Sequence, residues 1–370
     1  MTPAVAFRTD ASLQIGSGHF LRCLSLATAL RERGADCRFI CREHPGHRID
    51  IARERGFSVA TLPGTADKDA LDLPWKQLPA HAAWLGCDWR TDADQTVAAL
   101  DQQVTDWLVV DHYALDGAWE AQLQRSCRQL MVIDDLADRP HHCDLLLDQN
   151  LGRQRSDYAS LVSKNCSVLA GPAYALLRPE FAAQRAESLH RRSFSLPRHL
   201  LITMGGGDQR NVTKRVLDAL RLCRLPPDFR ITVVMGRDAP WLESVQRRAA
   251  DMPWTCKVRV DVSDMAHLMT ESDLSIGAAG GTSWERCCVG LPSMLLVLAD
   301  NQRRGAQALV GAGAAVLLSD GPDLADQLSE HLAALLKGDA LSTMSNAARA
   351  VTDGLGVERV LPYLLEPSRA

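Results

Sequence analysis

The chain has 370 residues, 46% of them hydrophobic and 23% charged, with a formal net charge of -4. This composition predicts a soluble globular protein with a sizeable core and room for two domains. A pI near 6.3 and the lack of any Lys/Arg run argue against binding to nucleic acid or anionic lipid. The expected partner is a small molecule or another protein.

The N-terminal stretch "MTPAVAFRTD" has neither a basic leader nor a long apolar core. No segment reaches the roughly 20 apolar residues that a membrane span needs. These features predict a cytoplasmic protein without stable membrane association. The eleven cysteines include no CxxC pair, so reduced thiols are expected. In "PHHCD", three neighbouring side chains cannot easily converge on one ion, so a loop is favoured over a metal site and no metal is expected.

Strand-like and helix-like segments alternate along the first half of the chain. The expected strands are residues 5–10, 36–42, 57–63, 106–112, 129–135 and 144–150. Short apolar runs separated by helical patterns predict parallel strands covered on both faces.

A second series of the same kind begins near residue 199. Its expected strands are residues 199–207, 229–236, 256–262, 273–279, 292–299 and 314–320. The chain is therefore predicted to be α/β, with two Rossmann-like, doubly wound domains in tandem. The expected boundaries are 1–185 for the first domain, 198–340 for the second and 341–370 for a helical segment, with a polar, basic linker over 181–199.

Open α/β sheets bind ligands at the carboxyl ends of their strands, so function is sought in the loops there, in a cleft where two such domains face each other. In the first loop, Gly16 and Gly18 allow a close backbone approach, and a helix follows from His19. The positive end of a helix disfavours imidazolium, so His19 is expected to be neutral and able to act as a general base. An ordinary turn that His19 merely caps is the alternative.

The second loop is "SIGAAGGTSWERCC", residues 275–288. Gly280 and Gly281 are predicted to turn the chain, and Thr282 and Ser283 to cap a helix whose first amides could bind a diphosphate. Glu285 is placed to accept hydrogen bonds from a ribose diol, or alternatively only to complement the helix dipole.

Two further loops carry weaker signals. "TMGGGDQRNVT" is not a GxGxxG sequence and lacks the P-loop ending, so it indicates neither a dinucleotide nor a nucleoside triphosphate. Asp111 and Tyr113 could contact a sugar, orient a histidine or simply start the next helix. Asp134 and Asp135 are expected only to start the next helix.

Together these motifs carry a resemblance that covers nearly the whole chain, from about residue 7 to beyond residue 301. "FRTDASLQIGSGHFLRCLSLA", "VDHYALDGAWE", "IDDLADRPHHCDLLLDQN", "GPAYALLRPEF", "ITMGGGDQRNVT" and "GGTSWERCCVGLP" resemble the UDP-2,4-diacetamido-2,4,6-trideoxy-β-L-altropyranose hydrolases of bacterial pseudaminic acid biosynthesis. More distantly, the chain resembles glycosyltransferases of the GT-B fold, including the N-acetylglucosaminyl transferase of peptidoglycan synthesis.

The resemblance implies that water displaces UDP from the anomeric carbon, with inversion and without a metal or cofactor. It implies that His19 is the base and that Asp10, Tyr113, Glu285, Asn301 and Gln302 contact the substrate. From the loop patterns described above, further substrate contacts are expected from Gly16, Gly18, Gly280, Gly281, Thr282 and Ser283. Asp10 is expected to position His19 or the sugar. Uracil is expected near residues 235–237 or 262–265.

Simple chemistry agrees with one base and no metal. UDP is a good leaving group, so backbone amides that neutralise its β-phosphate remove the need for a general acid. A GT-B transferase would use the same base to activate an acceptor hydroxyl, and a lipid acceptor would call for an exposed apolar patch that the sequence does not indicate. A UDP-sugar-binding protein without turnover is the third possibility, and the presence of His19 argues against it.

Overall fold

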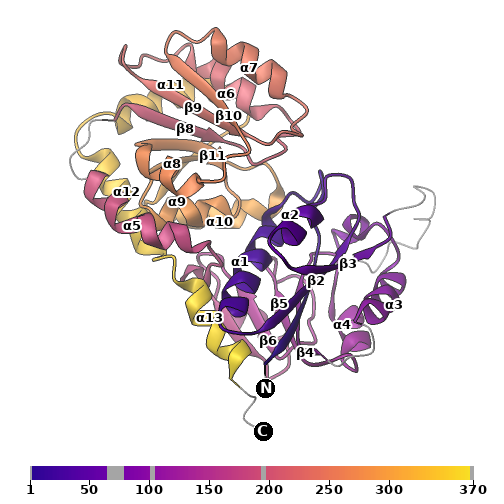
Figure 1. Cartoon of the computed structure of the whole chain (residues 1–370). Helices are drawn as coiled ribbons and strands as arrows, with labels where there is room; N and C mark the ends of the chain where they lie inside the picture. The colour runs from indigo at the N-terminus through magenta and orange to yellow at the C-terminus, as the bar shows by residue number, and fades with distance from the viewer. Residues whose placement is uncertain (1, 65–78, 101–104, 193–196, 367–370) are drawn as a thin grey trace. The chain divides into compact units, whose positions relative to one another are not determined.

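The computed structural model describes residues 2–64, 79–100, 105–192 and 197–366. The chain forms two compact units, drawn in Figure 1. The first combines Met1–Leu176 with Gly356–Ala370, and the second is Leu177–Leu355. The division thus falls nine residues before the predicted 185, and the last helix returns to the first unit instead of forming a separate segment with residues 341–355.

The first unit is built on a parallel sheet with the strand order β3-β2-β1-β4-β5-β6-β7. Its strands are β1 (Ala4–Thr9), β2 (Asp36–Arg42), β3 (Ser58–Leu62), β4 (Thr105–Asp111), β5 (Cys127–Ile133), β6 (Leu145–Asp148) and β7 (Ser167–Ala170). Six of these were predicted, and β7 was not. Strand β7 has four residues, lies at the edge of the sheet and buries only Leu169 fully, so it has no long apolar run.

Both faces of this sheet are covered by helices, as predicted for parallel strands. In β1, Phe7 packs into the core on one side with residues of the helices 18–32 and 356–365, and Ala6 packs into the core on the other side with residues of the helices 89–99 and 117–123 (α1, α13, α3 and α4 in Figure 1). The helices of this unit are α1 (Gly18–Glu32), α2 (Ile49–Glu54), η3 (Ala82–Leu85), α3 (Trp89–Ala99), α4 (Gly117–Leu123), η4 (Arg155–Tyr158), η5 (Pro172–Tyr174) and α13 (Gly356–Leu365).

The second unit contains a parallel sheet with the order β10-β9-β8-β11-β12-β13, and all six strands were predicted. The strands are β8 (His199–Thr203), β9 (Arg230–Met235), β10 (Thr255–Val260), β11 (Leu274–Ala278), β12 (Ser293–Leu296) and β13 (Ala315–Leu318). The helices are α5 (Pro179–Arg192), α6 (Val212–Leu220), α7 (Leu242–Ala250), α8 (Met265–Glu271), α9 (Thr282–Cys288), η6 (Asp300–Gln302), α10 (Arg303–Gly311), α11 (Leu324–Leu335) and α12 (Ala340–Val351).

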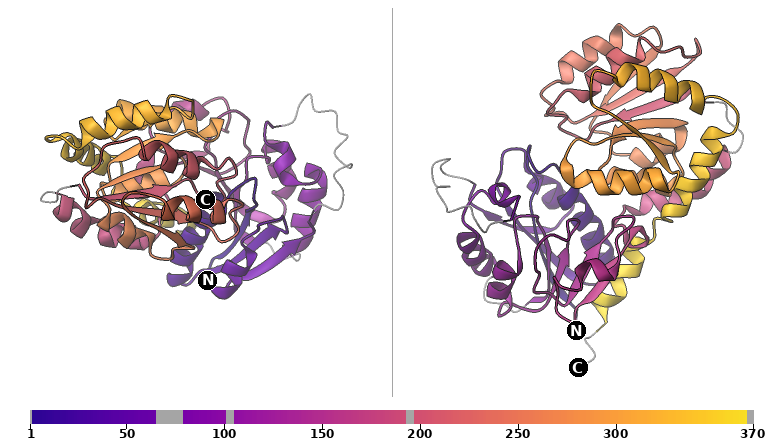
Figure 2. Two further views of the ribbon diagram at one scale, coloured as in Figure 1. Left: turned by 90° about the horizontal axis from the view of Figure 1, so that it is seen from above. Right: turned by 180° about the vertical axis from the view of Figure 1, so that it is seen from behind.

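The linker predicted over 181–199 is wrong for most of its length, because residues 179–192 form helix α5 (Figure 2). This helix is polar along most of its surface, which is why its sequence suggested a linker. It buries Phe181 and Ser188, and the Ser188 hydroxyl donates to the carbonyl of Val289 over 2.7 Å. A narrow buried face is enough to hold an otherwise polar helix.

Each sheet reverses its strand order once, between β1 and β4 in the first unit and between β8 and β11 in the second. Loops at the carboxyl ends of strands on either side of such a reversal diverge, and ligands commonly bind there. Most candidate residues follow β1, β4 and β11, so the topology places them at these positions, whereas Asn301 and Gln302 follow β12. In the described part of the chain, no helix combines the length and apolar character needed to cross a membrane.

Candidate active site

His19 lies in the first turn of α1, as predicted, directly after the loop that follows β1. Gly16 has a φ of +79°, a left-handed conformation that favours glycine, and its amide donates to the carbonyl of Ser12 over 2.9 Å. Gly18 is the first residue of the helix. The loop closes on itself and delivers His19 to the carboxyl edge of the sheet.

The imidazole of His19 is paired with Asp111, the last residue of β4. Its Nδ1 lies 2.6 Å from Oδ1 of Asp111, and both side chains are buried. Arg22, one turn further along α1, contacts the same carboxylate through Nε at 2.6 Å and Nη2 at 2.7 Å. Burial alone would raise the pKa of Asp111, but Arg22 and His19 hold that pKa well below its usual range. Asp111 is therefore an ionised acceptor.

This pairing determines which nitrogen of the ring can accept a proton. With Asp111 as acceptor, Nδ1 carries the hydrogen and Nε2 keeps its lone pair. The hydrogen-bonding contacts of described residues with the His19 ring are at Nδ1: Asp111 Oδ1 lies at 2.6 Å and Nη2 of Arg22 at 3.4 Å, and this Nη2 makes a shorter bond of 2.7 Å to Asp111. A histidine oriented by a carboxylate in this way can take a proton from water or from a hydroxyl group at Nε2.

Tyr113 lies beside this pair. Its ring meets the His19 ring edge to face, with the centroids 4.4 Å apart, and its hydroxyl donates to Asp135 over 2.7 Å. The rings of His81 and Trp84 also approach Tyr113, at 5.2 and 5.8 Å between centroids. Asp135 was predicted only to start a helix. This is wrong, because it is followed by a loop and its carboxylate binds both Tyr113 and Arg22.

The neighbouring Asp134 also starts no helix, contrary to the prediction. Its carboxylate accepts hydrogen bonds from the amides of Leu136 and Ala137 and from Arg139 and Tyr158. These contacts hold the loop after β5 in place. The role of Asp134 is thus structural, as predicted, but it stabilises a loop and does not start a helix.

Asp10 belongs to a second buried cluster and makes its contacts with other residues than His19. Its Oδ1 lies 2.8 Å from Arg8 Nη1 and accepts from the amide of Arg42 over 2.6 Å. Its Oδ2 lies 3.6 Å from His44 Nε2 and 3.5 Å from His112 Nε2. Asp10 therefore organises the carboxyl ends of β1, β2 and β4.

The "PHHCD" segment is committed to other contacts. His141 Nδ1 lies 2.7 Å from Glu120 Oε1, and the amide of His142 donates to the same carboxylate. The Cys143 thiol lies 3.7 Å from the Cys166 thiol. Among the described residues no three His, Cys, Asp or Glu side chains are grouped as metal ligands.

In the second unit, the loop after β11 leads into α9 through Gly280 and Gly281. The amides of Ser283 and Trp284 bond to the carbonyls of Gly280 and Gly281 at 2.9 and 3.1 Å. The prediction that Thr282 and Ser283 cap the helix is wrong, because the N-cap is Gly281 and no side chain caps it.

The Ser283 hydroxyl has a different partner, the buried guanidinium of Arg286. Arg286 Nη2 donates to Ser283 Oγ over 3.0 Å and to the carbonyl of Ala278 over 2.6 Å. Burial lowers the pKa of Arg286 to about 10. This side chain therefore ties the first turn of α9 to the end of β11 and places a positive charge under the loop.

Glu285 is in the first turn of α9, and its Oε1 lies 3.7 Å from Nη2 of Arg178. Burial raises its pKa, and Arg178 partly opposes that change. Asn301 and Gln302 lie in η6, after β12. The Gln302 amide nitrogen lies 3.7 Å from the position that a Cβ on Gly280 would take, so the structure brings Gln302 and the glycine loop together.

The segments expected near uracil lie at the ends of β9 and β10. The amide of Arg237 donates to Asp261 over 3.0 Å, and Gly236 packs on the carbonyl of Gly206, leaving no room for a Cβ. The glycine-rich loop after β8 thus adjoins residues 235–237. Its Asp208 accepts from the amides of Val212 and Thr213 at the start of α6.

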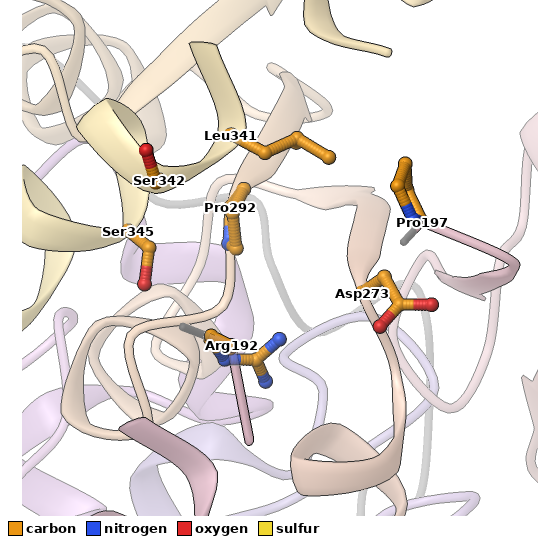
Figure 3. A pocket seen from close by; sticks show the side chains of 7 residues that line it. All are labelled: Arg192, Pro197, Asp273, Pro292, Leu341, Ser342 and Ser345. Carbon is orange, nitrogen blue, oxygen red and sulfur yellow. The ribbon is translucent and has the colours of Figure 1, made fainter. Parts of the chain in front are cut away.

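A small pocket of the second unit lies at the other edge of its sheet (Figure 3). Asp273 and Pro292, which line it, precede β11 and β12. Arg192 beside them donates to the carbonyls of Met269, Ser272 and Val289. This pocket is separate from the loops that carry the candidate residues, and Arg192 there serves to dock α5.

Arg22 and Asp135 are the site residues that the sequence reasoning missed. The sequence does contain a signal for Arg22. Residues three apart on a helix lie on the same face, and in "HFLR" Arg22 is three residues after His19. The partnership of Asp135 with Tyr113 and Arg22 joins three segments distant in the chain, so spacing carries no signal for it.

Comparison with known proteins identifies the fold. Residues 199–359 match the glycosyltransferase family 28 C-terminal domain. The solved structure of Acinetobacter baumannii MurG superposes with a TM-score of 0.71 and 16% identity, covering 98% of this chain and 99% of that chain. The protein therefore has the GT-B fold, with two Rossmann-like domains.

Two curated relatives align with most of the chain. The UDP-2,4-diacetamido-2,4,6-trideoxy-β-L-altropyranose hydrolase of Campylobacter jejuni is 27% identical over 277 residues, covering 74% of this chain and 84% of that protein. The UDP-N-acetylglucosamine–N-acetylmuramyl-(pentapeptide) pyrophosphoryl-undecaprenol N-acetylglucosamine transferase of Chromohalobacter salexigens is 29% identical over 384 residues, covering 95% and 94%. These similarities support a GT-B enzyme that uses a UDP-sugar.

Proposed function

We propose that the chain is a metal-independent hydrolase that releases UDP from UDP-2,4-diacetamido-2,4,6-trideoxy-β-L-altropyranose. The observation that carries the proposal is the His19–Asp111 pair at the carboxyl edge of the first sheet, with Nε2 of His19 available as a base. The similarity to the Campylobacter jejuni hydrolase, at 27% identity over 74% of the chain, supports this choice of substrate.

In this reaction, His19 Nε2 removes a proton from a water molecule while the water oxygen forms a bond to the anomeric carbon. The bond from that carbon to the β-phosphate oxygen breaks on the opposite side, so the configuration inverts and the electron pair leaves with UDP. Asp111 stabilises the imidazolium that forms, and Tyr113 contacts the sugar.

The second unit is proposed to hold the nucleotide. Backbone amides of Gly280, Gly281 and Thr282 and the hydroxyl hydrogen of Ser283 would bind the diphosphate, with the buried charge of Arg286 beneath them. Glu285 would accept hydrogen bonds from the ribose, and Asn301 and Gln302 would contact the substrate. The approach of Gln302 to Gly280 supports a shared site for these residues.

A GT-B transferase is the second candidate, supported by the similarity to the Chromohalobacter salexigens transferase across 95% of the chain. In that reaction His19 would activate an acceptor hydroxyl in place of water. Both candidate reactions use the same base and the same nucleotide, so they differ only in the nucleophile, which is water in the hydrolase and an acceptor hydroxyl in the transferase.

The deciding experiment is proton NMR of the purified protein with the UDP-sugar in EDTA-containing buffer, with no acceptor present. Under the proposal, free sugar forms at once, initially as the inverted anomer, together with an equal amount of UDP. If UDP binds but no sugar is released, the hydrolase proposal is wrong and a transferase is indicated.

A further inference from the structure

Arg22 occupies a central position among the polar side chains around His19. It projects from the inward face of α1 and is 8% exposed. Its guanidinium contacts two carboxylates: Asp111 through Nε at 2.6 Å and Nη2 at 2.7 Å, and Asp135 through Nη1 at 2.7 Å. One side chain thus joins α1 to the end of β4 and to the loop after β5.

Each of the two carboxylates also binds one of the rings assigned to the reaction. Asp111 Oδ1 lies 2.6 Å from His19 Nδ1, and Asp135 Oδ2 accepts from the Tyr113 hydroxyl over 2.7 Å. The two rings are in edge-to-face contact at 4.4 Å. The five side chains therefore close a ring of contacts in which Arg22 links the two halves.

Asp135 is also held through Oδ1, the carboxylate oxygen that Arg22 and Tyr113 do not contact. Its Oδ1 accepts from the Asn150 amide over 3.1 Å, and Asn150 is held in turn by Asp148 Oδ1 at 2.8 Å. The loop after β5 is further bound by Arg153, which donates to the carbonyls of Asp135 and Leu136. Asp135 is therefore anchored to the sheet independently of Arg22, which is what a fixed point for positioning requires.

The charges of the cluster change in a useful direction during proton transfer. With His19 neutral, Arg22, Asp111 and Asp135 carry one positive and two negative charges. When His19 takes a proton, the four groups become neutral together. In a buried site such compensation stabilises the imidazolium, and it depends on Asp135 as well as on Asp111.

We propose that Arg22 and Asp135 are positioning residues that hold the His19 and Tyr113 rings at one fixed separation and keep the hydrogen of His19 on Nδ1. This inference rests on the proposed function, since it takes His19 as the base. Arg22 acts through Asp111, and Asp135 acts through Tyr113 and Arg22. A lysine cannot replace Arg22 fully, because an ammonium group lacks the planar fork that contacts both carboxylates.

The test compares R22Q, R22K and D135N with two controls on exposed residues nearby in the chain. R33Q changes an exposed arginine just beyond α1, and D138N changes an exposed aspartate three residues after Asp135. Three quantities are measured for each: kcat for UDP release, the affinity for UDP, and the nitrogen-15 imidazole spectrum, with H19N used to assign the His19 signal.

For R22Q and D135N we expect kcat to fall about 10- to 100-fold, within the range of general base catalysis. UDP affinity should stay within twofold of wild type, and the His19 spectrum should change from the Nδ1–H tautomer to a mixture. R22K should fall between R22Q and wild type, and both controls should match wild type.

The proposal is overturned if R22Q and D135N keep the Nδ1–H spectrum and kcat within twofold of wild type. It is also overturned if UDP affinity falls in parallel with kcat, since that indicates general structural damage. D135N decides the matter if R22Q fails to fold. If the wild type releases no UDP, the proposed function fails, and the imidazole spectra still decide whether Arg22 and Asp135 control the tautomer.

Discussion

Buried arginines are balanced differently in the two units. In the first unit, Arg8 contacts Asp10 and Asp92 at 2.8 and 2.6 Å, and Arg22 contacts Asp111 and Asp135. Burial alone would lower the pKa values of Arg8 and Arg22, but the carboxylates raise them well above the usual range. Charge there is neutralised side chain by side chain.

In the second unit, the half-buried Arg192 and the buried Arg286 contact backbone carbonyls and one hydroxyl instead of carboxylates. Burial lowers their pKa values to about 9 and about 10. A hydrogen-bonded network of balanced charge, such as the one around Arg22, holds its side chains in fixed positions. A guanidinium without a carboxylate partner, such as Arg286 beside the loop of Gly280 and Gly281, favours a negatively charged ligand. The comparison shows that carboxylates balance these guanidinium groups in the first unit, whereas backbone carbonyls and one hydroxyl surround them in the second.

The largest expected effect tests the chemical part of this contrast. H19N should reduce kcat for UDP release by roughly 100-fold or more, the scale of losing a general base, with UDP affinity nearly unchanged. Release is followed by NMR and affinity by calorimetry. Retained turnover in H19N would show that the base lies elsewhere.

Close backbone packing around Arg286 is tested by G277A. A Cβ on Gly277 would lie 2.0 Å from Arg286 Nη1 and 2.7 Å from the carbonyl oxygen of Thr203 in the neighbouring strand. Arg286 can shift but the sheet carbonyl cannot, so we expect a loss of about 1–3 kcal/mol in the free energy of unfolding.

The matched control is G311A, because a Cβ there meets no atom within 4 Å and the position is helical. Denaturant unfolding of both variants gives the comparison. Equal stability of the two would mean that β11 has space beside Gly277, contrary to the structure.

Nucleotide binding by the second unit is tested by E285A. If the Glu285 carboxylate binds the ribose, as proposed, its loss should weaken UDP binding about tenfold, since hydrogen bonds to charged groups contribute roughly 1.5–3 kcal/mol. E271A, at an exposed position of α8, is the control. A uridine diphosphate without the ribose hydroxyls should bind wild type and E285A equally, and a tenfold difference with that ligand would contradict the assignment.

The last prediction concerns pH. Burial lowers the pKa of His112 to about 3, and its Nδ1 accepts from the amide of Ala114 over 3.1 Å. Between about pH 6.5 and 3 the unfolded chain binds a proton that the folded chain does not. Stability therefore falls as pH decreases through this range, by up to about 1.4 kcal/mol per pH unit.

H112N keeps an acceptor for the Ala114 amide and removes the titration. Its melting temperature should depend less on pH between 7 and 5 than that of the wild type or of H267Q, a control at a half-exposed position. An unchanged pH dependence in H112N would show that His112 is not the group responsible.

The amino-acid sequence by itself determined the α/β class, twelve of the thirteen described strands and a helix that carries His19 in its first turn. Apolar runs bounded by polar residues and a glycine-rich turn involve residues that are adjacent in the sequence, so they can be recognised without the tertiary structure. For the same reason the short edge strand β7 and the polar helix α5 were missed, since their stability comes from neighbouring elements.

Only the tertiary structure decided the partners of the candidate residues. Asp111 is 92 positions from His19, and Asp135 is 113 positions from Arg22, so no spacing rule connects them. It also assigned Asp10 to the cluster with Arg8 and His112 rather than to His19. Parallel strands bring their carboxyl ends to one edge of the sheet whatever the length of chain between them, and that geometry assembles the site.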